Sequence, residues 1–247
     1  SSVSTNAAGD GFRLAFGASD TGYGYILAGS SGADTITLAS DTDLQATYGD
    51  LSAHTVNSGS ILGSVVFGKG GDDTITGTAT GDMIFGGAGN DTLNSGGGQD
   101  DIFGGAGNDA INVNGATEGA SIGVFGGAGT DSLTFETNTA NAASVKDVET
   151  ITASGSGDDS LAILGSLLSG NIDLGGGTAD SLTLANGTNS LSVSNTETIT
   201  GGTGADSITL LAAQLSGGID LGGGSDSLQL ANGTNSLTLT DIESIIG

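Results

Sequence analysis

The sequence predicts an all-β protein that forms one elongated array of stacked repeats. A nine-residue repeat runs without interruption over residues 68–112. Apolar residues make up 36% of the 247 residues and aromatic residues only 4%. That content is thin for a large central core, so the chain must bury small aliphatic side chains in a regular stack or remain disordered. The regular repeat favours the stack.

The repeat places one aspartate behind glycines and ahead of an apolar residue. Adjacent frames read GKGGDDTIT, GTATGDMIF, GGAGNDTLN, SGGGQDDIF and GGAGNDAIN. Further copies occupy residues 29–37, 126–134, 154–162 and 201–209, and looser copies occupy 175–183 and 221–229. The sixth position is aspartate in every copy: Asp34, Asp73, Asp82, Asp91, Asp100, Asp109, Asp131, Asp159, Asp180, Asp206 and Asp226.

This arrangement of residue types suits a calcium-binding loop. Glycine turns with positive φ and leaves its carbonyl oxygen uncovered, and aspartate adds a carboxylate to the same loop. Calcium takes six to eight such oxygens. The residues after the aspartate form a short strand whose middle side chain faces inward. The glycines expected in these loops are Gly68, Gly70, Gly86, Gly87, Gly89, Gly96, Gly98, Gly104, Gly105, Gly107, Gly126, Gly127, Gly129, Gly202 and Gly204.

Four copies, which start at Gly86, Gly104, Gly126 and Gly201, match the pattern GGxGxDxUx at every position. The sequence therefore resembles the RTX family of secreted calcium-binding proteins. The resemblance implies a right-handed parallel β-roll or β-helix, in which two nonapeptides form one turn and every second block stacks on the one before it. It also implies several calcium ions between stacked loops, each held by backbone oxygens and aspartate carboxylates of neighbouring turns.

The repeat period divides the chain into three segments of one continuous array. We predict an irregular or β-structured segment over 1–67, an RTX β-roll over 68–136, and a wider solenoid over 137–247. Residues 155–200 and 202–247 are near copies, with Asn-Gly turns between short apolar strands. The spacing of the later aspartates predicts rungs of roughly 20–28 residues, alternately two-stranded and three-stranded. Glycine loops followed by strands such as ETIT also resemble the calcium-dependent S-layer proteins of Gram-negative bacteria.

The charge and composition exclude several classes of partner and site. Acidic residues outnumber basic ones 28 to 3, for a net charge of −25, so the chain should repel nucleic acid and anionic lipid and bind cations. No apolar run approaches the ~20 residues that a membrane span needs. Cysteine is absent, so thiolate metal sites are excluded. The single histidine, His54, lies in residues 39–66, which have no repeat character, and we expect a surface excursion there without a catalytic role.

Four phenylalanines, Phe67, Phe85, Phe103 and Phe125, each stand directly before a glycine loop. Their preceding neighbours Val66, Ile84, Ile102 and Val124 hold the inward position, so alternation points the phenylalanines outward. On the opposite sheet the outward places fall to Thr76, Asn94, Asn112 and Thr134. An exposed stripe of four phenylalanines is unusual. Either another part of the chain covers it, such as residues 12–16, or it contacts a second copy of the protein.

A second repeated acid, at Glu149, Glu197 and Glu243, precedes short strands in the second half. These residues are either extra calcium ligands or solvated strand residues, and we favour the second interpretation.

The sequence predicts a secreted structural protein rather than an enzyme. The favoured function is an S-layer or extracellular filament subunit at the bacterial cell surface, which assembles as a homo-oligomeric lattice or filament. The alternatives are an adhesin segment that binds a surface polysaccharide, and the calcium-folded tail of a secreted enzyme. No HExxH or GxSxG motif is present. Because crowded carboxylates oppose folding without a cation, we expect an unfolded chain in the cytosol and folding outside the cell. The resemblance to the RTX family implies export by type I secretion.

Overall fold

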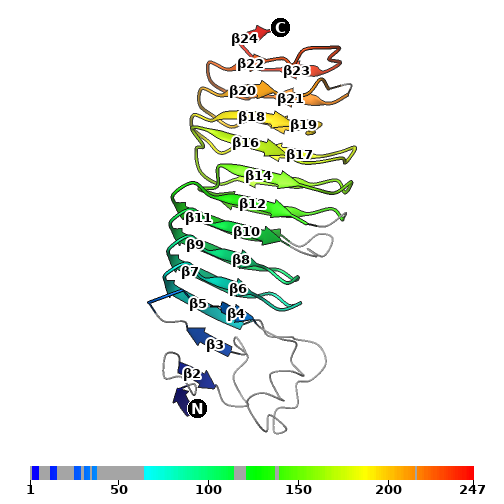
Figure 1. The fold of residues 1–247 in the computed structure, drawn as a ribbon. Helices are drawn as coiled ribbons and strands as arrows, with labels where there is room; N and C mark the ends of the chain where they lie inside the picture. The colour runs from blue at the N-terminus through cyan, green and yellow to red at the C-terminus, as the bar shows by residue number, and fades with distance from the viewer. Residues whose placement is uncertain are drawn as a thin grey trace.

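The computed structural model of the protein describes residues 2–5, 12–15, 25–28, 31–33, 35–37, 64–113, 121–136, 139–214 and 216–247. Within these ranges all regular elements are β-strands, and they stack into an elongated solenoid (Figure 1). The expected all-β solenoid is confirmed. In these ranges no helix has the length and apolarity to cross a membrane. Asp34, His54 and Phe16 lie outside the described residues.

The strands form two sheets that face each other across the core. Sheet A has 13 strands. They are β1 (Ser2–Thr5), β2 (Phe12–Ala15), β3 (Tyr25–Ala28), β5 (Ser64–Gly70), β7 (Met83–Ala88), β9 (Asp101–Ala106), β11 (Ser121–Ala128), β13 (Ala142–Lys146), β15 (Ser160–Ile163), β17 (Ser181–Thr183), β19 (Thr198–Thr200), β21 (Gly218–Asp220) and β23 (Thr238–Thr240).

Sheet B has 11 strands, which alternate in the chain with those of sheet A from β4 onward. They are β4 (Thr35–Thr37), β6 (Thr74–Thr76), β8 (Thr92–Asn94), β10 (Ala110–Val113), β12 (Ser132–Phe135), β14 (Thr150–Ala153), β16 (Gly170–Asp173), β18 (Ser190–Ser194), β20 (Ser207–Leu210), β22 (Ser227–Gln229) and β24 (Ser244–Ile246).

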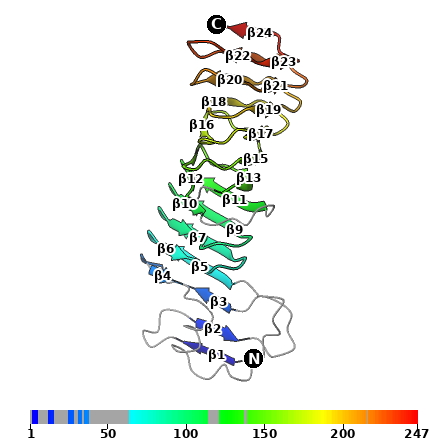
Figure 2. The same ribbon diagram turned by 90° about the vertical axis from the view of Figure 1, so that its right-hand side faces the viewer.

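Strand pairing follows the nonapeptide register. In the central run, Thr74 pairs with Thr92 and Ile84 pairs with Ile102, so each residue meets its equivalent two nonapeptides later. These pairs are parallel, as are the others from β3 to β24, whereas β1, β2 and β3 are joined antiparallel. Two nonapeptides therefore form one turn, and each turn contacts mainly its neighbours. Figure 2 shows the turns succeeding one another in chain order.

The core is a double column of small aliphatic side chains. Strand residues alternate between buried and partly exposed, as in β8, where only Leu93 is fully buried. Burial of each such side chain contributes roughly 1.5–3 kcal/mol. The inward residues of the central turns are Val66, Ile84, Ile102 and Val124 from sheet A, and Ile75, Leu93, Ile111 and Leu133 from sheet B. Regular stacking thus supplies a core despite the low aromatic content.

The outward faces of the two sheets differ, as the alternation predicts. On sheet A, the rings of Phe67, Phe85, Phe103 and Phe125 stack nearly parallel, with centroids 4.7–4.8 Å apart and interplanar angles of 6–10°. On sheet B the outward residues are polar, and the amide of Asn112 donates to Asn94 Oδ1 over 2.9 Å. The phenylalanines are partly exposed.

Residues 12–16 were one of the two possible partners of this stripe. Strand β2, which contains most of that segment, lies elsewhere. It pairs with β1 on one side and with β3 on the other, so it extends sheet A at the N-terminal end of the stack. It does not lie across the phenylalanines of β5, β7, β9 and β11. Strand β2 therefore does not provide the intrachain cover that was one of the two alternatives for the phenylalanine stripe.

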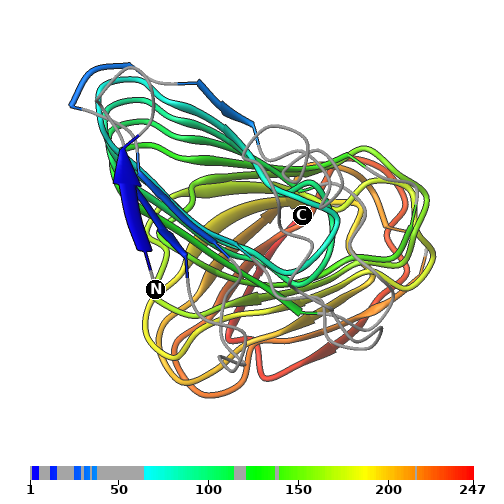
Figure 3. The same cartoon turned by 90° about the horizontal axis from the view of Figure 1, so that it is seen from below.

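The predicted alternation of two-stranded and three-stranded rungs is wrong. From β4 onward each described rung has one strand in each sheet, also beyond residue 137, where Ser160 pairs with Ser181 and Ser181 pairs in turn with Thr198. The long spacing from Asp131 to Asp159 arises because the first precedes a strand of sheet B and the second a strand of sheet A. Viewed along the stack, the turns overlie one another, with the C-terminal turns displaced from the first ones (Figure 3).

Candidate calcium sites

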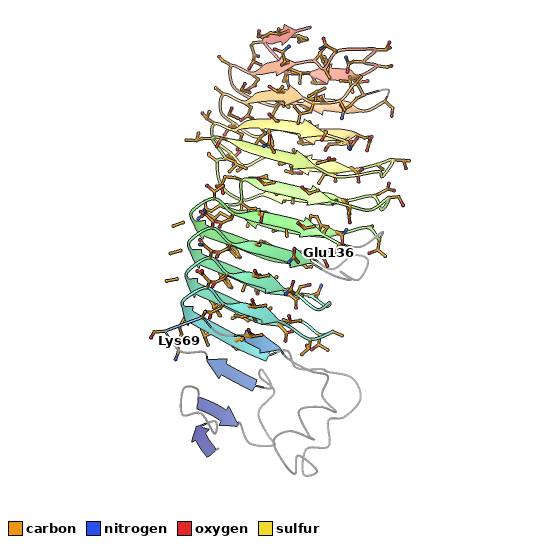
Figure 4. All side chains as sticks on the ribbon, in the orientation of Figure 1. Lys69 and Glu136 are labelled. Carbon is orange, nitrogen blue, oxygen red and sulfur yellow. The ribbon has the colours of Figure 1, made fainter. Side chains whose placement is uncertain are left out.

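Two rows of corners connect the sheets. The first corners lead from a strand of sheet A to the following strand of sheet B, and the second corners lead from sheet B back to sheet A. Lys69, at the end of β5, marks the first row, and Glu136, just after β12, marks the second row; Figure 4 shows them on opposite sides of the stack.

The structure places the predicted aspartates at these corners and buries them. All ten that fall within the described residues are at most 3% exposed. The first corners contain Asp73, Asp91, Asp109, Asp131, Asp206 and Asp226, and the second corners contain Asp82, Asp100, Asp159 and Asp180. The single repeat position thus produces two columns of buried carboxylates, one on each side of the core.

One oxygen of most of these carboxylates links successive turns. The backbone N–H of Asp73 donates to Asp91 Oδ1, that of Asp91 to Asp109 Oδ1, and that of Asp109 to Asp131 Oδ1, each over 2.8 Å. The same bond joins Asp82 to Asp100 (2.7 Å) at the second corners. We call this series the carboxylate ladder. Its hydrogen bonds fix the position of each side chain, because an N–H to carboxylate bond is charge-assisted.

The other oxygen of most ladder carboxylates has no hydrogen-bond donor. Buried polar atoms without a partner are rare, and a buried charge without one is costly. Among the described residues the only ion pair joins Lys146 to Asp147 at the surface, so basic side chains do not neutralise the ladder there. The oxygens concerned are the Oδ2 atoms of Asp91, Asp100, Asp109, Asp131, Asp180, Asp206 and Asp226.

Burial opposes the charged form of these acids. It raises the pKa of Asp100 to about 8, mainly by desolvation, which outweighs the lowering effect of the N–H from Asp82. Desolvation likewise raises the pKa of Asp180 to about 6, and neighbouring carboxylates add to this. The pKa values of Asp91 and Asp109 are raised for the same reason. The corners therefore favour either a proton or a bound cation on each carboxylate.

In several central repeats the opening glycine leaves space beside the Oδ2 atom of the aspartate in the same loop. A Cβ built on Gly104 would lie 2.6 Å from the Gly126 carbonyl oxygen and in close contact with Asp109 Oδ2. A Cβ on Gly86 would likewise meet the Gly104 carbonyl oxygen at 2.7 Å and Asp91 Oδ2. The space beside Gly86 and Gly104 is therefore flanked by a carboxylate oxygen and by a backbone oxygen of the next turn.

This set of oxygens fits calcium. Within the described residues no three His, Cys, Asp or Glu side chains gather as a metal-binding group. An ion at a corner must therefore take most ligands from the backbone, and a hard cation that accepts six to eight carbonyl and carboxylate oxygens has that preference. The protein chain alone thus supplies both the buried oxygens without donors and the space beside the glycines.

The remaining predicted glycines shape the loops. Gly105 has φ +118°, and a Cβ there would clash with the Gly87 carbonyl of the previous turn. Gly107, with φ +129°, meets the Gly89 carbonyl in the same way. These positions need glycine both for the left-handed backbone and for the close approach of stacked loops. Positive φ also occurs at Gly87, Gly89, Gly96, Gly98, Gly127, Gly129 and Gly204.

Comparison with models of protein families decides what this repeat is. Residues 63–79, 76–111 and 193–212 match the model described as RTX calcium-binding nonapeptide repeat, in four copies. The chain contains RTX calcium-binding nonapeptide repeats. These RTX repeats bind several calcium ions. No curated protein and no solved structure matched the chain in the other two comparisons.

Glu149, Glu197 and Glu243 lie at corners just before strands rather than in them; Glu243 is exposed and the other two are partly exposed, yet each makes a specific hydrogen bond. Their Oε2 atoms accept the backbone N–H groups of Asp131 (2.8 Å), Asp180 (2.9 Å) and Asp226 (2.6 Å). Each therefore extends the carboxylate ladder by one corner beyond the last aspartate of its run. The longer side chain compensates for a different corner, in which a non-glycine residue two positions earlier has positive φ, such as Asp147 at +54°.

One predicted aspartate differs from the others in its contacts, and sequence reasoning missed three further residues of the ladder. Asp82 is among the predicted ligands, but its Oδ2 atom accepts hydrogen bonds from Thr78 N (2.6 Å) and Thr78 Oγ1 (3.0 Å). Three asparagines, Asn141, Asn189 and Asn235, stand in the ladder in place of aspartate. A sequence signal exists for Asn189 and Asn235, because residues 184–192 and 230–238 follow the nonapeptide frame with asparagine at the sixth position.

Substitution of Asp109 should weaken calcium-dependent folding more than substitution of Asp180. We expect Asp109→Asn to raise the calcium concentration at the folding midpoint on the order of tenfold or more, since loss even of groups that only support a ligand costs that much. Asp180 lies in GGGTAD, where Thr178 replaces the fourth glycine, so its loss should shift the midpoint less. Calcium titration followed by circular dichroism measures both midpoints, and equal shifts would refute the ranking.

Proposed function

We propose that this protein is a calcium-folded structural protein of the bacterial cell surface, a subunit of an S-layer or of an extracellular filament. The observation that supports this most is the carboxylate ladder, with its buried oxygens that have no donor. At least seven described aspartates place such an oxygen at a corner. A stack of this design holds together only where cations are abundant, which is the condition outside the cell.

In the proposed sites, the aspartates of the RTX loops and the opening glycines of the next turn hold the ions. At the first corners, Asp109 Oδ2 and the Gly126 carbonyl oxygen face the space beside Gly104. Asp109 Oδ1 is already fixed by the N–H of Asp91, so the carboxylate presents its second oxygen in a set direction. A bound calcium ion supplies the positive charge that neutralises successive corners. Binding free energy then becomes folding free energy.

The same residues explain how the chain could be exported. Without a cation the stack brings one carboxylate to each RTX corner in a chain of net charge −25, and like charges oppose compaction. The calcium-poor cytosol would thus keep the chain unfolded and suited to type I secretion. Extracellular calcium modules have affinities of roughly 10⁻⁴–10⁻³ M, which match millimolar calcium outside the cell.

The phenylalanine stack is the proposed assembly surface. Its four rings cover each other's faces, so the outer surface of sheet A presents ring edges. Edges pack against apolar or aromatic surfaces, whereas a sugar would need an open ring face. A second copy of the chain therefore fits this stripe better than a polysaccharide does. An exposed apolar stripe of this kind typically marks an interface.

Replacement of the stripe tests the assembly. We expect Phe85→Ser with Phe103→Ser to leave the calcium-loaded chain folded but to abolish sheets or filaments, because partly exposed rings contribute to the contact more than to the core. Sedimentation velocity and electron microscopy in millimolar calcium measure assembly, and circular dichroism measures folding. A matched control replaces Thr76 and Thr134, on the outward face of sheet B, with serine.

The outcomes separate the candidate functions. Sheets or filaments that depend on the two phenylalanines support a structural subunit. A wild-type chain that remains monomeric in calcium would contradict it and favour the adhesin segment or the tail of a secreted enzyme. Unfolding of the double variant would mean that the stripe stabilises the monomer instead.

A further inference from the structure

Not all ladder corners present the same chemistry, and the asparagine corners differ most from the aspartate corners. Asn189 is fully buried at a first corner, and Asn235 lies at a second corner. Both keep the ladder bond, because Asn189 Oδ1 accepts the N–H of Leu167 and Asn235 Oδ1 that of Gln214, each over 3.1 Å. The difference therefore lies in the second side-chain atom alone.

In an aspartate corner the second atom is Oδ2, an acceptor that lies among other acceptors. In the Asn189 corner it is Nδ2, a donor. This nitrogen lies 3.0 Å from the carbonyl oxygens of Ala185 and Gly187 and 2.9 Å from Asp206 Oδ1, so its two hydrogens are shared among three acceptors. Two carbonyl oxygens of the same loop and one carboxylate oxygen of the next turn thus receive hydrogen bonds from a neutral side chain of the protein itself.

The other two asparagine corners repeat the arrangement. Asn235 Nδ2 donates to the carbonyl oxygen of Ala231 over 2.9 Å, with Gly233 O at 3.5 Å. Asn141 Nδ2 donates to Thr139 O and to Asp159 Oδ1, each over 2.9 Å. The assignment of nitrogen and oxygen follows from the partners, since exchange would direct an NH₂ group at a backbone N–H and an oxygen at carbonyls.

We infer that Asn141, Asn189 and Asn235 close their corners without metal, the amide nitrogen serving in place of a calcium ion. The inference rests on the proposed function, in which aspartate Oδ2 atoms and loop carbonyls hold calcium. A neutral amide offers no anionic oxygen, and its hydrogens point at carbonyl oxygens of its own loop, where an aspartate would present the second oxygen that the proposed calcium sites need. Residue six of the frame thus decides whether a corner takes an ion.

The asparagines stand at the beginning of runs of aspartate corners. At the second corners the order along the stack is Asn141, Asp159, Asp180 and Glu197, and at the first corners it is Asn189, Asp206, Asp226 and Glu243. Each later run of calcium corners therefore begins on a metal-free asparagine corner. The asparagines divide the solenoid into calcium-dependent blocks.

The test is to convert an asparagine corner into an aspartate corner and to count ions. Asn189→Asp keeps the shape and the Oδ1 bond but replaces the donor with an anionic acceptor. We expect this variant to bind one more calcium ion than the wild type by native mass spectrometry and by isothermal titration. At a sub-saturating calcium concentration its melting temperature should fall below that of the wild type, and saturating calcium should restore it. Asn235→Asp, at the less buried corner, provides a second variant if Asn189→Asp does not fold.

Asp109→Asn is the matched reverse substitution and should bind one ion fewer. An unchanged ion count in both asparagine variants, together with a loss of one ion in Asp109→Asn, would overturn the inference and leave the proposed ligands intact. An unchanged count in Asp109→Asn would instead refute the aspartate ligands of the proposed function. A gain of one ion in Asn189→Asp or Asn235→Asp, with the loss in Asp109→Asn, supports both.

Discussion

Removal of calcium with EGTA should abolish the β-sheet signal of this protein in far-ultraviolet circular dichroism. The reason is the environment of the ladder: Asp91, Asp100 and Asp109 are at most 2% exposed, and each has an oxygen without a donor. Each such buried charge costs several kcal/mol without a counter-charge, while marginal domains are stable by only about 5–15 kcal/mol. The free-energy cost of several uncompensated corners therefore exceeds the free energy of unfolding that the aliphatic core can supply.

The effect should be reversible and specific for a hard divalent ion. Addition of millimolar calcium after EGTA should restore the spectrum, whereas an equal ionic strength of sodium chloride should not, because screening does not replace ligands inside a buried corner. The measurement is circular dichroism before and after each addition, with sedimentation to confirm compaction. A spectrum that stays unchanged in EGTA would contradict both the proposed sites and calcium-dependent folding.

The sequence predicts the central turns well because local and long-range signals coincide there. The glycines, the aspartate and the apolar residue recur every nine positions, so Ile84 and Ile102 stack in the only register that buries both. A shift by one residue would turn these side chains to solvent. The outward phenylalanines follow from the same alternation, and their stacking follows from the constant spacing of the turns.

The later turns were less predictable because their corners differ in length and in kind. Asp131 and Asp159 look like successive members of one row, yet they lie on opposite sides of the core. The cause is a corner without glycine at Asp147, whose positive φ turns the chain between β13 and β14. An aspartate with a left-handed backbone conformation is permitted but uncommon, and the sequence pattern does not predict it. The role of Glu149 depends on that corner and was hidden with it.

The candidate calcium ligands are likewise only partly predictable from the sequence. The aspartates are recognisable because their position in the frame is constant, whereas the state of Oδ2 depends on other residues of the same loop. Thr78 satisfies Asp82, although its frame contains the same sixth residue as the others. Whether a corner lacks a donor is thus a property of the folded loop, which single positions of the sequence do not specify.

Gly104→Ala should be among the most damaging single substitutions in the chain. The added methyl group would lie 2.6 Å from the Gly126 carbonyl oxygen and would occupy the space beside Asp109 Oδ2. Overpacking of this kind costs about 1–3 kcal/mol or more, and here it also displaces the proposed ion. We expect the loss of one bound calcium ion and a fall in stability of at least about 3 kcal/mol.

Gly223→Ala provides the matched control, because a Cβ at Gly223 has no heavy atom within 4 Å and this glycine also lies in a repeat loop. Calcium-dependent melting and ion counting on both variants separate the loss of a site from a general intolerance of alanine in glycine loops. The control should melt close to the wild type with all its ions. If Gly104→Ala also keeps every ion, the cation does not bind in the space beside Asp109. The ligands of the cation must then lie elsewhere in the loop.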